Sequence, residues 1–300
     1  ASNGPDDSAV MTWSRIATVI RNGMSSSEIS HFNFDAVQAA AMFLGLLPPE
    51  QSTFDMESEK GQVFASAVER FVCVILGEMC GDSETQSSRW FAACEECIQT
   101  LFRLHPSPDH VMARIVSAMY ATLSTSISGE KVVCSNARLS RFFFVLGQTA
   151  LNSLVLAENL SQMTRSRKLA AQKEAIAAEQ AKRGSKKISD QEAEHDAEMT
   201  AAIDMELETE LFKSLNEDML LENLLSKFVP MVAAVVASDD SEKSYASVML
   251  RQTATLSLCK FMSVSATVCE KYLPLLFTSL ENNPDEACRT TIMVAIGDLM

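Results

Sequence analysis

Apolar residues recur at helical spacing along most of this chain. Near its end, Ile292, Ile296 and Leu299 stand at i, i+4 and i+7, which is the stripe of an amphipathic helix. No segment shows the apolar–polar alternation between turn signals that is typical of a β-strand, so we expect essentially no sheet. In the first half the pattern predicts six helices, over residues 11–21, 34–47, 58–79, 89–104, 111–123 and 136–160.

Residues 220–300 contain two types of segment, and each type occurs twice. Residues 227–232 (Lys-Phe-Val-Pro-Met-Val) return 44 positions later as Lys-Tyr-Leu-Pro-Leu-Leu, and residues 250–262 return at an offset of 38 as residues 288–300. A pair of helices that recurs at about this distance is typical of HEAT and armadillo arrays. The repeat therefore predicts an all-α fold, an α-solenoid of HEAT-type helical hairpins. The alternative is an ordinary helical bundle in which the similarity is a coincidence.

The sequence also marks some helix ends. Ahead of the last apolar segment, Asn283 can cap a helix and Pro284 can take the first helical position, where its missing N–H group costs nothing. The prolines of the other repeated segment, Pro230 and Pro274, fall inside apolar runs. Because proline cannot donate the backbone hydrogen bond of a helix interior, we expect a late helix start or a kink at each of them.

Composition agrees with a helical chain and narrows the possible partners. Of the 300 residues, 47% are hydrophobic, which is ample for a core, and only 8 are Pro and 10 Gly. The formal net charge of −14 excludes a protein that binds DNA through its general surface, because such binding requires basic side chains that neutralise phosphates. Any contact with nucleic acid must therefore be local, or must involve other subunits.

The cysteines and the start of the chain bear on its compartment. Eight cysteines fall on apolar helical stretches, where a free thiol behaves as a small buried hydrophobe, and the first residues have no secretory pattern. No run approaches the ~18 apolar residues of a membrane span. We expect a reducing compartment and no membrane partner. The chain has no initiator Met and stops within a repeated segment, so we also expect a piece of a longer protein.

The charge pattern changes abruptly at Ser161. Residues 165–187 hold eight basic residues against two glutamates, whereas residues 190–222 hold twelve acidic residues and one lysine. The simpler interpretation is a solvated linker whose halves attract each other; the other is that its basic half touches DNA or an acidic partner. The candidate contact residues are Arg165, Arg167, Lys168, Lys173, Lys182, Arg183, Lys186 and Lys187.

These charges predict a chain in three parts. Residues 1–160 form an N-terminal helical, HEAT-like array. Residues 161–210 form a charged insertion, partly helical and partly disordered, because they hold too few apolar residues to build a core. Residues 211–300 form HEAT repeats that are incomplete at the C-terminus.

No residue pattern in the chain points to catalysis. Cys94 and Cys97 have the spacing of half a zinc site, but no second pair or histidine stands at ligand spacing, so we expect both on a buried stripe. The four histidines are scattered, and glycine-rich phosphate loops and hydrolase, metalloprotease or kinase motifs are absent. We therefore expect a protein that is not an enzyme, with no cofactor, no metal and no small-molecule substrate.

Two arginines occupy equivalent positions in the repeated segments. Arg251 and Arg289 each follow the start of their predicted helix, and Asp285 precedes Arg289 by four residues, whereas Ser247 stands at the equivalent position before Arg251. Arginines in such places bridge to the neighbouring repeat through an acidic side chain or helix-end carbonyls. We expect this structural, inter-repeat role; contact with a ligand is the alternative.

Three segments of the chain, two of them within the repeats, resemble one protein family in their amino-acid sequence. Residues 250–262 (Leu-Arg-Gln-Thr-Ala-Thr-Leu-Ser-Leu-Cys-Lys-Phe-Met), residues 292–299 (Ile-Met-Val-Ala-Ile-Gly-Asp-Leu) and residues 141–147 (Arg-Phe-Phe-Phe-Val-Leu-Gly) are similar to the HEAT-repeat non-SMC subunits of condensin, the chromosome-condensing complex. The resemblance covers about residues 140–160 and 205–300 and is only architectural before them. The resemblance does not distinguish a subunit of the first condensin complex from one of the second.

The resemblance implies a scaffold. Subunits of this family are α-solenoids that bind the kleisin subunit, approach the SMC subunits, which carry the ATP chemistry, and help to hold DNA during mitotic chromosome condensation. They are found in the nucleus and on chromosomes, with a cytoplasmic pool. A curved stack of helix pairs suits this role because it offers an extended surface for a peptide-like segment. The alternative is a generic HEAT-repeat adaptor that binds peptide cargo or another protein complex.

Overall fold

The structure is a computed structural model that describes residues 33–46, 59–77, 87–127, 135–182, 224–238 and 247–299. Within these ranges all regular structure is helical and no strand is present. The α-helices are α2 (Phe34–Gly45), α3 (Glu59–Gly77), α4 (Ser87–Leu104), α5 (Pro108–Ile127), α6 (Asn136–Lys182), α8 (Val229–Ala237), α9 (Val248–Val264), α10 (Ala266–Asn282) and α11 (Glu286–Leu299). A 3₁₀ helix, η4 (Leu224–Lys227), precedes α8.

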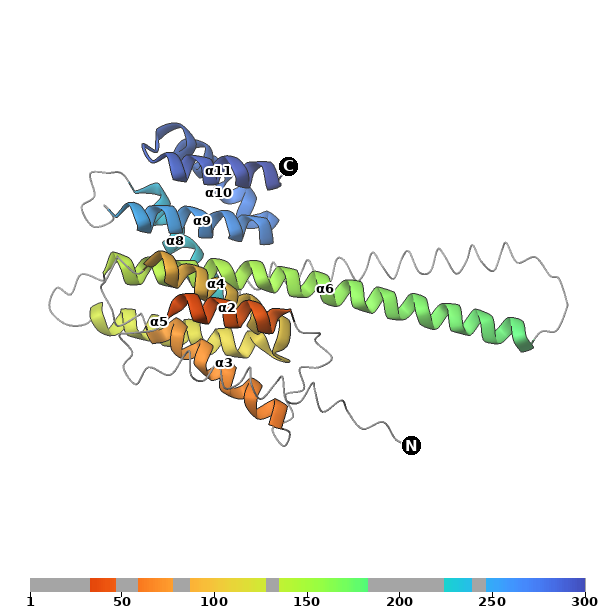
Figure 1. The fold of residues 1–300 in the computed structure, drawn as a ribbon. Coiled ribbons are helices and arrows are strands. Elements are labelled where there is room, and N and C mark those ends of the chain that lie inside the picture. The colour runs from red at the N-terminus through yellow and green to blue at the C-terminus, as the bar shows by residue number, and fades with distance from the viewer. Residues whose placement is uncertain are drawn as a thin grey trace.

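Alternate helices stack side by side in a file. α2 packs on α4, α4 on α6, α6 on α9 and α9 on α11, and these five helices form the first layer (Figure 1). The helices between them in sequence form the second layer, in which α3 contacts α5 and α8 contacts α10. Each hairpin thus buries its apolar side against the next hairpin, which is how an α-solenoid is built. The predicted all-α solenoid of HEAT-type hairpins is confirmed.

Large aromatic side chains lie in the middle of the array. Trp90 of α4 is fully buried, and its indole N–H donates to the carbonyl of Val74 in α3 at 3.3 Å. Phe142 of α6 meets Phe228, which lies between η4 and α8, edge to face at 5.0 Å between ring centroids. Burying an aromatic side chain stabilises a fold by about 1.5–3 kcal/mol. The apolar run 142–146 of α6 is therefore central to the core.

Most helices of the first half lie where the sequence predicts them. α2 begins at the predicted residue, Phe34, because the side chain of Asn33 accepts a hydrogen bond from the backbone N–H of Ala36 at 3.2 Å. The bounds of α3, α4 and α5 differ from the predicted ones by a few residues. The helix predicted over residues 11–21 lies outside the described residues.

α6 is much longer than the apolar pattern predicts. It runs without a break from Asn136 to Lys182, over 47 residues, whereas the apolar pattern stops at residue 160. Beyond that point Ala, Lys, Glu and Gln are frequent, and their high helix propensity continues the helix without a core to pack on. Figure 1 shows this part projecting far beyond the stacked helices. Residue 160 is thus not a helix end, and the division of the chain into three parts remains a prediction.

The predicted start of the last helix is wrong. α11 begins at Glu286 rather than at Pro284, and the carboxylate of Asp285 caps it by accepting from the backbone N–H of Cys288 at 3.3 Å. Asn283 ends α10 instead, and its Oδ1 accepts from the backbone N–H of Asp285 at 2.9 Å. A carboxylate is the better cap here because its charge also interacts favourably with the positive end of the helix dipole.

The two repeated prolines have different surroundings. Pro230 lies at the N-terminus of α8, directly after η4, so the predicted late helix start is confirmed there. Pro274 lies inside α10, which continues through it. α10 can start earlier because Ser265 caps it, its buried hydroxyl oxygen accepting from the backbone N–H of Val268 at 3.2 Å.

Candidate interaction surfaces

The projecting part of α6 carries the predicted basic residues. We call residues 162–182 the arm, because most described side chains from Gln162 onward are exposed. Arg167, Lys168 and Lys173 are exposed, and Arg165 is half-buried. The remaining candidates are Lys182, which ends α6, and Arg183, Lys186 and Lys187, which lie outside the described residues.

The basic side chains of the arm are spread around the helix. At 3.6 residues per turn, Arg165 and Lys168 lie about 60° apart, while Arg167 and Lys173 point to other sides. From Arg165 to Lys182 the arm extends roughly 26 Å at 1.5 Å per residue. The arm is therefore a rod with positive charge on several sides, which suits contact with a polyanion but forms no single recognition face.

Arg251 and Arg289 occupy the same position, the fourth residue, in α9 and α11. The backbone N–H of Arg251 donates to the carbonyl of Ser247, and that of Arg289 to the carbonyl of Asp285, both at 3.2 Å. The side chain of Arg289 donates from Nη1 to the carbonyls of Asn283 (2.9 Å) and Pro284 (3.4 Å) in the turn between α10 and α11. The inter-repeat role of the two arginines stays a prediction.

A polar contact that sequence reasoning missed joins α9 to α11. Gln252 Nε2 of α9 donates to Asp285 Oδ2 at 2.8 Å, and the hydroxyl of Thr255 lies 3.9 Å from Cys288 Sγ. Partial burial alone would raise the pKa of Asp285, but hydrogen bonds from Gln252 and Cys288 outweigh it and lower that pKa. Asp285 therefore serves two purposes, since it caps α11 and binds the neighbouring helix of the first layer.

A second polar cluster joins α4, α6 and α9. Gln148 Nε2 of α6 donates to Glu95 Oε1 of α4 at 2.8 Å. Lys260 of α9 places its Nζ 5.4 Å from the centre of the Phe144 ring, within the range of a cation–π interaction. Burial lowers the pKa of Lys260, and the negative charge of Glu95 opposes this effect. Three consecutive helices of the first layer are thus linked by charge and hydrogen bonding.

The second layer presents an aromatic surface. Tyr120 of α5 is 49% exposed, and its ring lies 5.2 Å from that of Phe228 and 6.3 Å from that of Phe142. On α10, Lys271 Nζ lies 5.0 Å from the centre of the Tyr272 ring. Partly exposed tyrosines are frequent in the energetically important parts of protein interfaces. The available signal in the sequence was that Tyr120 is one of only three tyrosines.

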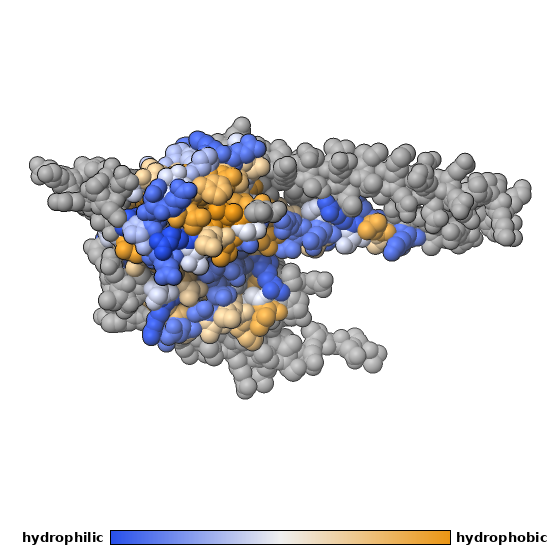
Figure 2. All heavy atoms as spheres, turned by 90° about the horizontal axis from the view of Figure 1, so that it is seen from above, coloured by the Kyte–Doolittle hydropathy of each residue, from blue (hydrophilic) through white to orange (hydrophobic). Residues whose placement is uncertain are grey.

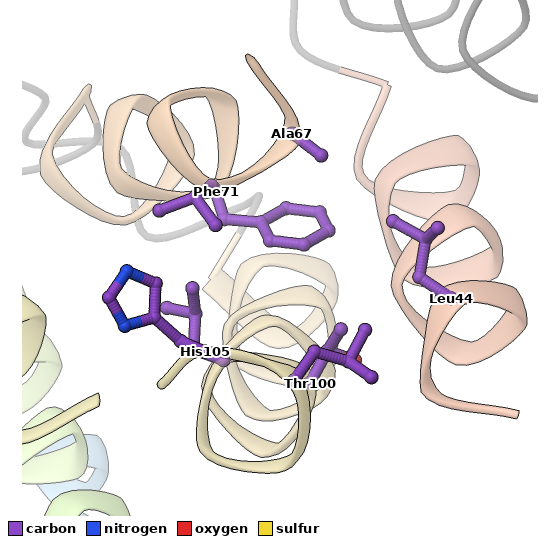
Figure 3. Close-up of a pocket in the computed structure, with 8 residues that line it drawn as sticks. Leu44, Ala67, Phe71, Thr100 and His105 are labelled. Atoms are coloured by element: carbon purple, nitrogen blue, oxygen red, sulfur yellow. The ribbon is translucent and has the colours of Figure 1, made fainter. Parts of the chain in front are cut away.

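A small pocket lies between α2, α3 and α4 (Figure 3). Its cavity volume is about 10 Å³, close to the minimum that one water molecule needs, so it has no room for a ligand. The hydroxyl of Thr100 donates to the carbonyl of Ala41 at 2.8 Å, and Nδ1 of His105 accepts from the backbone N–H of Ser107 at 3.0 Å. The lining residues are Leu44, Ala67, Val68, Phe71, Thr100, Leu101, Leu104 and His105. Such a lining brings together no nucleophile and base.

The pair Cys94 and Cys97 lies in the core. Both thiols are fully buried in α4, on the predicted apolar stripe, and burial raises the pKa of each. A raised pKa keeps them as neutral thiols, which are poor nucleophiles and poor metal ligands. Among the described residues, no three His, Cys, Asp or Glu side chains are grouped so that they could hold a metal ion.

One stretch of the described helices is long and apolar enough to cross a membrane, namely residues 136–171 of α6. The sequence analysis missed it because polar residues such as Gln148 and Asn152 interrupt the apolar run. Of its most apolar window, 61% is buried inside the fold. α6 packs against α4, α5 and α9, so its apolar character is that of a core helix.

Apolar side chains also gather at the α11 end of the array. Figure 2 looks down on this end and shows them over α10 and α11. Phe277, Met293 and Val294 are the large exposed hydrophobic residues of these two helices. In each of the hairpins before it, the first-layer helix is covered by the next one, whereas the described structure ends at α11.

Comparison with curated proteins gives relatives of one kind. "Condensin complex subunit 1" of Saccharomyces cerevisiae is 24% identical over 270 residues, which cover 87% of this chain. "Condensin-1 complex subunit CAP-D2" of Arabidopsis thaliana is 26% identical over 242 residues, and "Condensin complex subunit 1" of Homo sapiens is 28% identical over 224 residues, each covering 70% of the chain. No protein-family model matches the chain.

The chain spans between about a sixth and about a fifth of the length of these relatives: 22% of the yeast protein and 16% of the plant and human proteins. The matched part is much larger than the segments that carry the resemblance in the sequence, since it covers at least 70% of the chain in each case. The matched proteins of a fungus, a plant and an animal are thus all condensin subunits, the same family that the repeated segments resemble. Over the region that they share, this chain is similar to condensin complex subunit 1.

Proposed function

We propose that this chain is part of a non-catalytic HEAT-repeat scaffold of a condensin complex that binds the kleisin subunit and lies beside the SMC subunits. The observation that carries the proposal is the two-layered solenoid, whose described surface offers extended helix faces and a small apolar pocket rather than convergent reactive groups. The relationship to condensin complex subunit 1 suggests the complex. The ATP chemistry then belongs to the SMC partners.

The proposed role implies a cellular process and a location. The scaffold acts in mitotic chromosome condensation, in the nucleus and on chromosomes, with a cytoplasmic pool. DNA is engaged locally, by the basic residues of the arm, or through other subunits, because the chain as a whole has a net charge of −14.

The kleisin segment lies across the second layer. The support for this choice is Tyr120, whose half-exposed ring stands on Phe228, and the neighbouring pair Lys271 and Tyr272 on α10. A tyrosine supplies a large apolar contact area with few rotatable bonds, so it loses little conformational entropy on binding. An extended segment running past α5, α8 and α10 would meet these side chains in turn.

Titration calorimetry of the 300-residue chain with overlapping kleisin segments tests the proposal. We expect one segment to bind with 1:1 stoichiometry and Tyr120→Ser to weaken it at least tenfold. The matched control is Phe43→Ser, which removes an exposed aromatic ring from α2 in the first layer and leaves the affinity unchanged. If no kleisin segment gives a heat of binding, the proposal is contradicted. If both variants lose the same amount of affinity, the assignment of the surface is contradicted.

The second candidate is a generic HEAT-repeat adaptor for peptide cargo, which the same aromatic surface on an α-solenoid also suits. Affinity capture from nuclear extract separates the two functions. SMC subunits retained with the chain support the condensin scaffold. A reproducible set of partners without any SMC subunit supports the adaptor.

A further inference from the structure

The root of the arm exposes three large apolar side chains. Val155, Leu160 and Met163 of α6 are 44%, 46% and 52% exposed, although α6 is a core helix up to this point. Single exposed apolar residues are common on protein surfaces, but several within about two turns of one helix form a patch that marks an interaction site. We call these three residues the root patch.

The root patch occupies one side of α6. At 100° per residue, its three members fall within a sector of about 140°, and Val155 and Met163 are about 12 Å apart along the axis. Leu169, which is 50% exposed, lies on the opposite side of the helix from Leu160. A sector of this width and length fits the apolar stripe of a second helix, which recurs at i, i+4 and i+7.

The charges beyond the patch indicate what kind of helix fits. Arg167 and Lys173 follow within three turns, are exposed and lie in the same sector of the helix as the root patch, together with one exposed acidic side chain, Glu174; Lys168 points out of this sector. A helix that lies along the patch and continues along the arm would place its later residues beside these cations. Acidic side chains at those positions would complement them, whereas basic ones would be repelled.

We propose that the root patch is a docking site for an amphipathic helix of a partner protein, with its apolar stripe on Val155, Leu160 and Met163 and its acidic residues beside Arg167 and Lys173. The patch belongs to the first layer, so this contact is separate from the kleisin surface proposed on the second layer. Nucleic acid is a poorer occupant of the patch because aliphatic side chains gain nothing from phosphates.

Fluorescence anisotropy with two labelled helical peptides tests this docking on the full 300-residue chain. Both peptides carry leucine at i, i+4, i+7 and i+11; one has glutamate at its remaining positions and the other has lysine. We expect the glutamate peptide to bind at least tenfold more tightly than the lysine peptide. The double variant Leu160→Glu, Met163→Glu is expected to weaken the glutamate peptide at least tenfold.

Leu169→Glu is the control, because it introduces a glutamate at a leucine of similar exposure that points about 180° away from Leu160 and about 120° away from Met163. It is expected to leave the affinity within twofold of wild type, and circular dichroism checks that both variants remain helical. Equal binding of the two peptides, or an equal loss in Leu169→Glu, overturns the proposal. A duplex DNA probe that responds to the root-patch variant while the peptide does not would assign the patch to nucleic acid and overturn it as well.

Discussion

The hydroxyl of Ser257 donates a hydrogen bond of 2.8 Å to the carbonyl of Phe143, at the place where α9 packs on α6. The two residues are 114 positions apart, on either side of the charged insertion. A Cβ atom added at Gly147, one turn further along α6, would lie 2.9 Å from Oγ and 3.0 Å from Cα of Ser257. The glycine is therefore what lets these two first-layer helices approach so closely.

Gly147→Ala is expected to destabilise the fold although alanine is the better helix former. The gain in helix propensity is about 1 kcal/mol. Packing a methyl group against the backbone of α9 costs about 1–3 kcal/mol, because the opposing atom cannot rotate away. We expect a net fall in the free energy of unfolding, measured by urea denaturation.

Gly297→Ala is the control for this variant. Gly297 lies in α11, and a Cβ atom there would meet nothing within 4 Å. The substitution is expected to raise the free energy of unfolding by about 0.5–1 kcal/mol through helix propensity alone. Equal gains in both variants would show that α6 and α9 are not held in close contact at Gly147.

Asp285 is expected to make the fold less stable in acid. Partial burial alone would raise its pKa, but hydrogen bonds from Gln252 and Cys288 outweigh burial and lower the pKa below its ordinary value of 3.8. The folded chain then holds this proton less tightly than the unfolded chain. The stabilisation is complete above the ordinary pKa and is lost as the pH falls through the lowered pKa.

Asp285→Asn tests this pH dependence, because asparagine can still cap α11 but does not titrate. The free energy of unfolding is compared between about pH 5.5 and about pH 3, and the fall is expected to be smaller in the variant than in wild type. Parallel falls in the two proteins would mean that the carboxylate contributes nothing to acid sensitivity.

Lys260 is expected to make the fold more stable in alkali. Burial lowers its pKa from the ordinary value of 10.5, against the effect of Glu95, so the fold carries the penalty of a buried charge at neutral pH. That penalty is relieved as the pH rises through the lowered pKa, because the folded chain then releases its proton before the unfolded chain does. Stability contributed by this residue thus rises toward pH 10.5.

Lys260→Met removes the charge and keeps a flexible side chain of similar length against Phe144. The difference in free energy of unfolding between variant and wild type is expected to shrink as the pH rises from 7 toward about 10. Lys271→Met is the control, since Lys271 also lies over an aromatic ring but is exposed. A constant difference for Lys260→Met across this range would contradict the prediction.

The arm is expected to supply the salt-sensitive part of any DNA binding. Each phosphate that a basic side chain neutralises contributes about −0.9 to the slope of log affinity against log salt concentration. Replacing Arg165, Arg167, Lys168 and Lys173 by glutamine should weaken binding of a DNA duplex and flatten this slope by up to roughly 3.6. Fluorescence anisotropy at several salt concentrations measures both quantities.

Glu174→Gln on the same arm is the control, because it changes the charge in the other direction and leaves the helix intact. Its slope is expected to equal that of wild type or to be slightly steeper. If the fourfold glutamine variant keeps the wild-type slope, the arm is the solvated linker of the simpler interpretation.

Much of the fold could be predicted because repetition and helix chemistry are local. The offset of 38 pairs Ser247 with Asp285, and each residue caps its helix by accepting from the backbone N–H three positions later, on Leu250 and Cys288. A side chain that reaches a backbone group three residues away needs no other part of the chain. The order of segments and the solenoid class could therefore be predicted from the amino acids.

The candidate site was less predictable, because its contacts join distant segments. The sequence shows the basic residues of the arm as a run of charges. It does not show that they continue the same helix as the core residues of α6. Periodicity also does not reveal that Gln252 reaches Asp285, or that Tyr120 stands on Phe228. Those pairs depend on how one hairpin is placed on the next.

The sequence by itself determined that this chain is helical and repetitive, because hydrophobic period, caps and repeats are properties of neighbouring residues, and it contains segments that resemble the HEAT-repeat subunits of condensin. Only the tertiary structure decided that α6 packs on α9 through Gly147 and Ser257, and that Val155, Leu160 and Met163 remain exposed where α6 leaves the array. The physical reason is that side chains of the same apolar type are buried or exposed according to which helix lies beside them, and that neighbour is chosen by packing across more than a hundred residues of chain.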